Sequence, residues 1–127
     1  MKRPQPRAGT TAAKNLLLLQ RRLKKSNAVS DPVALDIFAS RARTMVGKVP
    51  CLTRTRAGSG GYWITGVNGL LTTREMLRLQ GLPETFIQIA EAAAVSEPQL
   101  RQMIGNAMSV NVLVTILSRL LPALGLC

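Results

Sequence analysis

The stretch LLTTREMLRLQGLPETF, residues 70–86, contains both the start signal and the stop signal of one short helix. Thr72 and Glu75 have the Thr-x-x-Glu spacing of a capping box, in which each side chain bonds a backbone N–H of the other residue. Gly81 stands where helices commonly end in the left-handed conformation, and the proline two residues later prevents continuation. The pattern therefore predicts a helix over residues 73–80.

Two arginines share one face of this helix. Arg74 and Arg78 are four residues apart and are neighbours on a helix surface, while Met76, Leu77 and Leu79 supply an apolar side. On an isolated helix, such a pair of arginine side chains is most simply exposed to solvent without a partner. A role for the pair in binding depends on further basic residues elsewhere in the chain.

Arg54 and Arg56 supply those further basic residues. The segment VPCLTRTRAGSGGYWITGVNG, residues 49–69, is expected to form extended arms around AGSGG and the turn signal VNG. On an extended segment, residues two apart point the same way, and the following glycines permit close backbone approach. These two arginines, together with Arg74, Arg78 and the glycine-rich bend, could bind a phosphate backbone.

The N-terminal part of the chain is strongly basic. Residues 1–30 contain no acidic side chain, and Ala12 to Lys25 are expected to form a basic amphipathic helix. A solvated tail, a nuclear localisation patch at RRLKK and an organelle transit peptide are all compatible with this composition. Beyond it, alternation of Val33, Leu35 and Ile37 predicts a half-buried strand, and residues 41–48 are expected to be a basic connector.

The last third of the chain has helical signals. Residues 85–94 are expected to add a short helix, Ser96 to cap another, and residues 110–121 to form a packing helix with an apolar stripe. The small residues that separate the last two expected helices are Gly105, Asn106 and Ala107. That interruption is either a simple helix terminus and turn, or an exposed amide and backbone that contact a polar small molecule.

Charge and composition limit the chemistry. The 127 residues carry a net charge of +11, an excess that suits polyphosphate partners or anionic membranes. With no histidine and two cysteines, neither a zinc cluster nor a disulfide framework is predicted, and no metal site or catalytic residue is assigned. Cys51 is expected to be a small apolar filler, and the longest early apolar run, Leu16 to Leu19, is too short to predict a membrane span.

In order, three segments resemble the C-terminal end of the cytosine carbon-5 DNA methyltransferases. They are PCLTRTRAGSGGYWI, LLTTREMLRLQGLPETF and RQMIGNAMSVNVLVTIL, within residues 50 to about 124. The Leu-Thr-x-Arg-Glu and Arg-Leu-Gln-Gly-x-Pro pattern, followed by Gly-Asn-Ala, is similar to the family's ninth and tenth motifs. Their order and separation make the resemblance specific.

The resemblance implies a fold and a cofactor. It implies an α/β fragment, mostly helical with a short β-hairpin or strands, from a Rossmann-like enzyme dependent on S-adenosylmethionine. Asn106 and Ala107 would border the methionine part of that cofactor. Arg74, Glu75 and Arg78 would be mainly architectural, with Arg74 anchoring the target-reading region. Together with the arginine pattern described above, Arg54, Arg56, Arg74 and Arg78 are the candidates for DNA binding or for support of the target-reading domain.

The resemblance also implies a reaction on a flipped-out cytosine, in which a cysteine thiolate adds to carbon 6 before carbon 5 is methylated. The family's glycine-rich cofactor motif, Pro-Cys-Gln nucleophile loop and Glu-Asn-Val acid segment are absent from these 127 residues. PCLT mimics the nucleophile dipeptide, but leucine replaces the glutamine and Cys51 lies later in the chain than the family's catalytic cysteine, so Cys51 is not assigned as the nucleophile.

Three parts and two functions are therefore expected. Residues 1–30 would be a basic N-terminal segment, residues 31–69 the end of the target-recognition region, and residues 70–127 the C-terminal helical part of the catalytic domain. The chain would be a methyltransferase segment, inactive alone, that acts on DNA with a separate N-terminal portion and no membrane. The alternative is a non-catalytic basic module that binds DNA or a partner. The nucleus in a eukaryote, and otherwise the cytoplasm, is the expected location, with organelle targeting left open.

Overall fold

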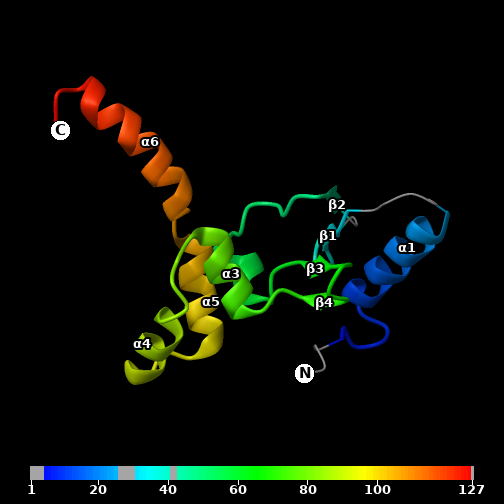
Figure 1. Ribbon diagram of the computed structural model, residues 1–127. Coiled ribbons are helices and arrows are strands. Elements are labelled where there is room, and N and C mark those ends of the chain that lie inside the picture. The colour runs from blue at the N-terminus through cyan, green and yellow to red at the C-terminus, as the bar shows by residue number, and fades with distance from the viewer. Residues whose placement is uncertain (1–4, 26–30, 41–42, 127) are drawn as a thin grey trace. The chain divides into compact units, whose positions relative to one another are not determined.

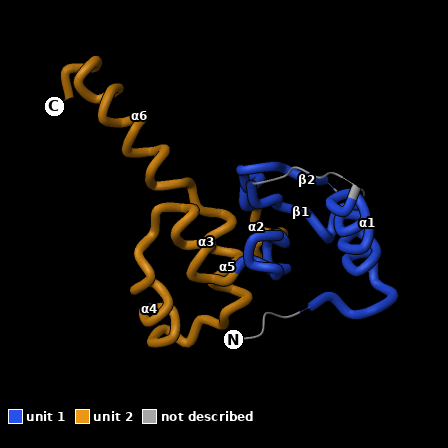
Figure 2. Tube along the Cα trace, turned by 45° about the vertical axis from the view of Figure 1, so that its right-hand side comes forward, with its two compact units in different colours: residues 1–52, 59–71 blue, residues 53–58, 72–127 orange. Residues whose placement is uncertain are grey.

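The computed structural model describes residues 5–25, 31–40 and 43–126, and predictions for residues 1–4, 26–30, 41–42 and 127 lie outside this range. The chain divides into two compact units, coloured separately in Figure 2: unit 1 comprises residues 1–52 and 59–71, and unit 2 comprises residues 53–58 and 72–127. The elements, in chain order, are α1 (Thr11–Lys25), β1 (Val33–Asp36), β2 (Arg43–Val46), α2 (Arg54–Gly58), β3 (Trp63–Ile64), β4 (Gly69–Leu70), α3 (Thr73–Gln80), α4 (Phe86–Ala92), α5 (Glu97–Asn106) and α6 (Val110–Ala123).

Unit 1 contains a four-stranded sheet with the order β2-β1-β3-β4, labelled in Figure 1. All three strand pairs are antiparallel, and Leu35 lies opposite Thr44 of β2 and Trp63 of β3. The prediction of a basic connector over residues 41–48 is wrong for Arg43–Val46, which form edge strand β2. Sequence pattern could not reveal this strand, because its four side chains are exposed and its backbone bonds to β1 hold it in place.

Helix α1 packs on this sheet and closes the core of unit 1. Its buried face contributes Ala12, Leu16 and Leu19, which contact Val33, Leu35, Ile37 and Trp63. The Asn15 side-chain amide donates to the carbonyl oxygens of Ile37 and Ala39, at 3.0 and 2.9 Å. Helix α1 begins at Thr11, one residue before the expected Ala12, and ends at the expected Lys25.

Strand β1 is buried along its whole length, so the prediction of a half-buried strand is only partly right. Val33 and Leu35 face the α1 core, but the alternate residues Ala34 and Asp36 are also buried. The Asp36 carboxylate accepts a hydrogen bond from the Phe38 backbone N–H at 3.1 Å. A carboxylate engaged in this local turn can be buried at a position where alternation predicts solvent.

Strands β3 and β4 form the hairpin that the VNG turn signal predicts. Asn68 has the left-handed φ of 47° that asparagine tolerates in turns. Thr65 ties the hairpin to β1, since its hydroxyl oxygen accepts from the Val33 backbone N–H at 2.9 Å. Cys51 lies in an irregular segment of the same unit and is exposed, so the expectation of a buried apolar filler is wrong.

Unit 2 is helical. Residues 54–58 form the short helix α2, so the prediction that Arg54 and Arg56 lie on an extended segment is wrong. Two residues along a helix differ by about 200° in direction, so these two side chains do not share a face. The Thr53 carbonyl accepts from the Ala57 N–H at 2.9 Å, which closes the first turn, and Ala57 is fully buried.

Helix α6 is exposed rather than packed. None of its residues is buried, and Figures 1 and 2 both draw it leading away from the other helices of unit 2. Val112, Val114 and Ile116 are each more than half exposed, at 54, 60 and 52%. The expectation of a packing helix is therefore wrong for the described chain.

The stretch Glu97–Ala123 is long and apolar enough to cross a membrane by length and composition alone. Residues 107–109 interrupt it between α5 and α6, and α5 buries Leu100 and Ile104. The 14 residues of α6 span only about 21 Å, less than the ~30 Å hydrocarbon core of a bilayer. The absence of a membrane partner stays a prediction.

The described residues form a small mixed helix and strand fold. The α/β character and the mostly helical content agree with expectation, whereas the sheet is antiparallel rather than the parallel sheet of a Rossmann-like domain. Antiparallel neighbours can be joined by a short connection, as β3 and β4 are.

Candidate nucleic-acid and cofactor site

Helix α3, which carries Arg74, has the predicted boundaries. The Thr72 hydroxyl oxygen accepts from the Glu75 backbone N–H at 3.2 Å, and the Glu75 carboxylate accepts from the Thr72 backbone N–H at 2.7 Å. Gly81 ends the helix with a φ of 71°, and its N–H donates to the Arg78 carbonyl. The capping box and the glycine stop are both confirmed, which fixes where the α3 arginines project.

Arg74 and Arg78 converge on one acidic residue in the loop after α3. The Arg78 Nε donates to the Glu84 carboxylate at 2.7 Å, and the Arg74 Nε lies 3.8 Å from it. Both arginine side chains remain 70% exposed. Exposed ion pairs of this kind contribute about 0–1 kcal/mol, so this pairing leaves both guanidinium groups accessible to a partner.

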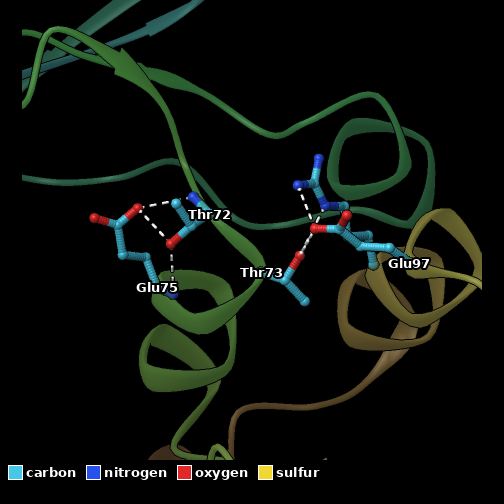
Figure 3. A network of polar contacts seen from close by, with 5 residues as sticks. Thr72, Thr73, Glu75 and Glu97 are labelled. Atoms are coloured by element: carbon cyan, nitrogen blue, oxygen red, sulfur yellow. Dashed lines mark hydrogen bonds and ion pairs between the residues drawn. The ribbon is translucent and has the colours of Figure 1, made fainter. Parts of the chain in front are cut away.

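A second polar cluster joins the start of α3 to α5. The Thr73 hydroxyl donates to the Glu97 carboxylate at 2.6 Å, as Figure 3 shows beside the capping box. Arg101 donates from Nε to the Thr73 oxygen at 2.9 Å and from Nη2 to Glu97 at 2.8 Å. The Thr73 hydroxyl, with Arg101, holds the pKa of the Glu97 carboxyl below its ordinary value, although burial acts in the opposite direction.

The Gly-Asn-Ala segment lies at the end of α5, where two contacts fix it. A Cβ on Gly105 would stand 2.5 Å from the Thr53 carbonyl oxygen and 2.7 Å from the Ala57 Cβ, so only glycine lets α2 approach so closely. The buried Gln80 side-chain amide donates to the carbonyl oxygens of Ile104 and Ala107, at 3.1 and 3.4 Å. The Ile104 carbonyl also accepts from the Ala107 backbone N–H at 3.2 Å, so Gln80 adds a second bond there and supplies a partner to the Ala107 carbonyl at the end of α5.

A cavity of about 630 Å³ lies between α2, the α4–α5 connection and α5. Its lining residues are Arg54, Ala93, Ala94, Val95, Gln99, Gln102, Met103 and Asn106. The cavity thus brings together Arg54 and Asn106, which the sequence assigned to two different roles. Arg56, Arg74, Arg78 and Ala107 are not among its lining residues.

The lining of this cavity has side chains that can hydrogen-bond a polar or anionic group. Its lining has one guanidinium, three carboxamides and no carboxylate. A guanidinium donates charge-assisted hydrogen bonds to carboxylate or phosphate oxygens, and a carboxamide both donates and accepts. The lining is therefore suited to a ligand that carries an anionic group.

Sequence reasoning missed Gln99, Gln102 and Met103. Together with Asn106 they follow the i, i+3, i+4, i+7 spacing of one helix face, which was the available signal. This spacing alone does not predict a binding site, because polar faces on exposed helices are common. The tertiary structure places α2 beside this face of α5, and the two helices together form the cavity.

Comparison with known proteins identifies the class and then the family. A model of the C-5 cytosine-specific DNA methylase family matches residues 12–121, a range that includes α1 and the sheet as well as the two helical motifs. This match assigns the chain to the DNA methyltransferases. Because it covers most of the chain, the chain belongs to the C-5 cytosine-specific DNA methylase family. No curated protein and no solved structure matches the chain.

Proposed function

We propose that this chain is the C-terminal segment of a DNA (cytosine-5)-methyltransferase, which transfers a methyl group from S-adenosylmethionine to cytosine in DNA. The observation that carries the proposal is the family match over residues 12–121. Two structural features support it. The two helical motifs that carry the resemblance lie in one compact unit, and the cavity of that unit contains Asn106.

In this proposal, α3 to α6 are the last helices of a Rossmann-like catalytic domain. The exposed apolar side chains of α6 support this reading, because an apolar helix without a partner buries little surface that would stabilise it. A sheet in a separate N-terminal portion would cover them. Arg54, Arg56, Arg74 and Arg78 would support the target-reading region or face DNA.

The cavity fits one end of S-adenosylmethionine better than the whole cofactor. Arg54 and Asn106 could hold a methionine carboxylate, because both can donate hydrogen bonds to it. The lining has no carboxylate to accept hydrogen bonds from ribose hydroxyls, so that half of the molecule would need groups outside the cavity. When bound, the cofactor would supply the methyl group. Ala107 would lie beside the cavity as part of the loop that ends α5.

We propose that the chain alone does not methylate DNA, because these 127 residues lack the Pro-Cys-Gln loop and the Glu-Asn-Val segment of the family. The experiment is tritiated methyl transfer to DNA, measured with this chain alone and with a separately produced N-terminal methyltransferase portion. We expect transfer only in the mixture, and less of it with Asn106→Ala. Methyl transfer by the purified chain alone would contradict the proposal.

A second candidate function is a non-catalytic module that binds DNA or a protein partner. The concentration of basic residues in unit 1, eleven against two acidic ones, favours this alternative. Salt-sensitive DNA binding without methyl transfer, in the mixture as well as alone, would support the module and reject the split enzyme.

For localisation we propose the nucleus in a eukaryotic cell and the cytoplasm otherwise. The basic run RRLKK, residues 21–25, supports nuclear import. A fluorescent fusion of the full chain tests this, and accumulation in an organelle would reject it.

A further inference from the structure

The solvent face of α1 is a strip of positive charge. On a helix of 3.6 residues per turn, Lys14 and Arg21 lie opposite the buried Leu16 and Leu19. Arg22 and Lys24 widen this strip on either side and are exposed, so the strip contains four cations. No ion pair engages these four cations within the described parts of the chain.

The strip is not neutralised by its own unit. Asp31 and Asp36 are the only acidic residues in unit 1, and Asp36 is buried at the end of β1. From Lys14 to Lys24 the strip is about 15 Å long, at 1.5 Å per residue. This length passes over about four phosphates of one DNA strand, which rise 3.4 Å each along the axis.

We infer that the solvent face of α1 is a docking surface for the phosphate backbone of double-stranded DNA. Charge complementarity carries this assignment, since phosphates are the anions that clustered lysine and arginine side chains neutralise with release of counterions. The inference takes DNA as the partner named under the proposed function. It adds a surface that none of the resembling motifs contains.

A lipid surface is the competing polyanion, and the packing of α1 argues against it. A helix that lies in a membrane inserts its apolar face into the lipid. The apolar face of α1 is already buried against its own sheet through Ala12, Leu16 and Leu19. Among the described side chains of α1, the exposed large apolar ones are Leu17 and Leu18, at 55 and 44% exposure, so this helix offers little apolar surface for insertion.

The experiment measures binding of the full chain to a fluorescein-labelled DNA duplex of about 25 base pairs, by anisotropy across a salt series. The double variant Lys14→Gln/Arg21→Gln removes two charges from the strip and keeps good helix formers. Each lost phosphate contact lowers the slope of log K against log salt by about 0.9, and the pair by about 1.8. The same relation corresponds to about eightfold weaker binding per contact at 0.1 M salt, so we expect a loss of about 10- to 60-fold.

The matched control is Arg7→Gln/Lys48→Gln, which removes the same charge from exposed positions of unit 1 outside the strip. Equal weakening by both variants would show a diffuse charge effect and overturn the docking surface. Circular dichroism checks that α1 remains folded in both variants. Vesicles with about 30% phosphatidylserine form a further arm, and loss of vesicle binding with unchanged DNA binding would overturn the assignment in favour of lipid.

The outcomes also separate this inference from the proposed function. If the strip variant binds DNA as well as the parent chain while the reconstituted mixture still transfers methyl groups, the α1 surface is wrong and the methyltransferase proposal stands. If the strip variant loses DNA binding but no mixture is active, the docking surface stands and the methyltransferase proposal fails.

Discussion

Replacement of Gly105 by alanine tests the close approach of α2 and α5, on which the unit 2 cavity depends. In an unobstructed helix interior, a change from glycine to alanine stabilises by about 0.5–1 kcal/mol. Here the added Cβ would stand 2.5 Å from the Thr53 carbonyl oxygen and 2.7 Å from the Ala57 Cβ. Carbon contacts are favourable near about 3.5–4.0 Å, so α2 would have to move by roughly 1 Å.

The magnitude follows from these opposing effects. Overpacking costs about 1–3 kcal/mol, and the obstructing Thr53 atoms are backbone, which places the cost toward the upper end. After the helix-propensity gain is subtracted, we expect Gly105→Ala to lower the free energy of unfolding by about 1–2 kcal/mol. Gly105 lies in unit 2, and for a folded unit of that size the melting temperature falls by about 4–8 °C for each kcal/mol.

The assay is urea and thermal unfolding followed by circular dichroism at 222 nm, which reports the helices. Gly58→Ala is the matched control, because its Cβ would meet the Gln102 side chain, at 2.8 Å from Cγ, rather than backbone. That side chain can rotate away, so the control should lose less stability than Gly105→Ala. An unchanged or raised stability of Gly105→Ala would refute the close approach, since it is the result expected for an open helix.

Three further predictions concern other parts of the fold. Ala94 holds a left-handed φ of 54° after α4, and Ala94→Gly should raise stability by about 1 kcal/mol by relieving that strain, whereas a loss in thermal unfolding would contradict it. The lowered pKa of Glu97 means that its contribution to stability is present above its ordinary value of 4.5 and is lost as the pH falls through the lowered folded value. Thr73→Val removes the main cause and should flatten the dependence of melting temperature on pH in that acidic range; an unaltered pH profile would contradict the assignment. Asn15→Ala leaves two buried carbonyl groups without their donor and should cost about 2 kcal/mol, measured by urea unfolding with Trp63 fluorescence, and an unchanged midpoint would count against that role.

The sequence by itself determined the elements whose signals are local. The bonds of a capping box join residues three apart, so Thr72 and Glu75 fix the start of α3 without help from the rest of the chain. The apolar spacing of α1 and the turn signal before β4 were equally readable. The motifs around these elements were also sufficient to indicate the methylase family, which the match over residues 12–121 confirms.

Tertiary structure alone decided the elements held by distant partners. The backbone of Arg43–Val46 became a strand because β1 offers it hydrogen bonds, and its exposed side chains carry no pattern. Residues 54–58 became a helix although the Pro-led segment that contains them was expected to be extended, and Gly105, far along the sequence, gives that helix room to approach α5. The cavity that brings Arg54 and Asn106 together follows from this approach. Sequence patterns reveal hydrogen bonds between near neighbours, such as those of a capping box, but they do not reveal which distant segments pack together. The candidate site of this protein lies where two such segments, α2 and α5, pack against each other.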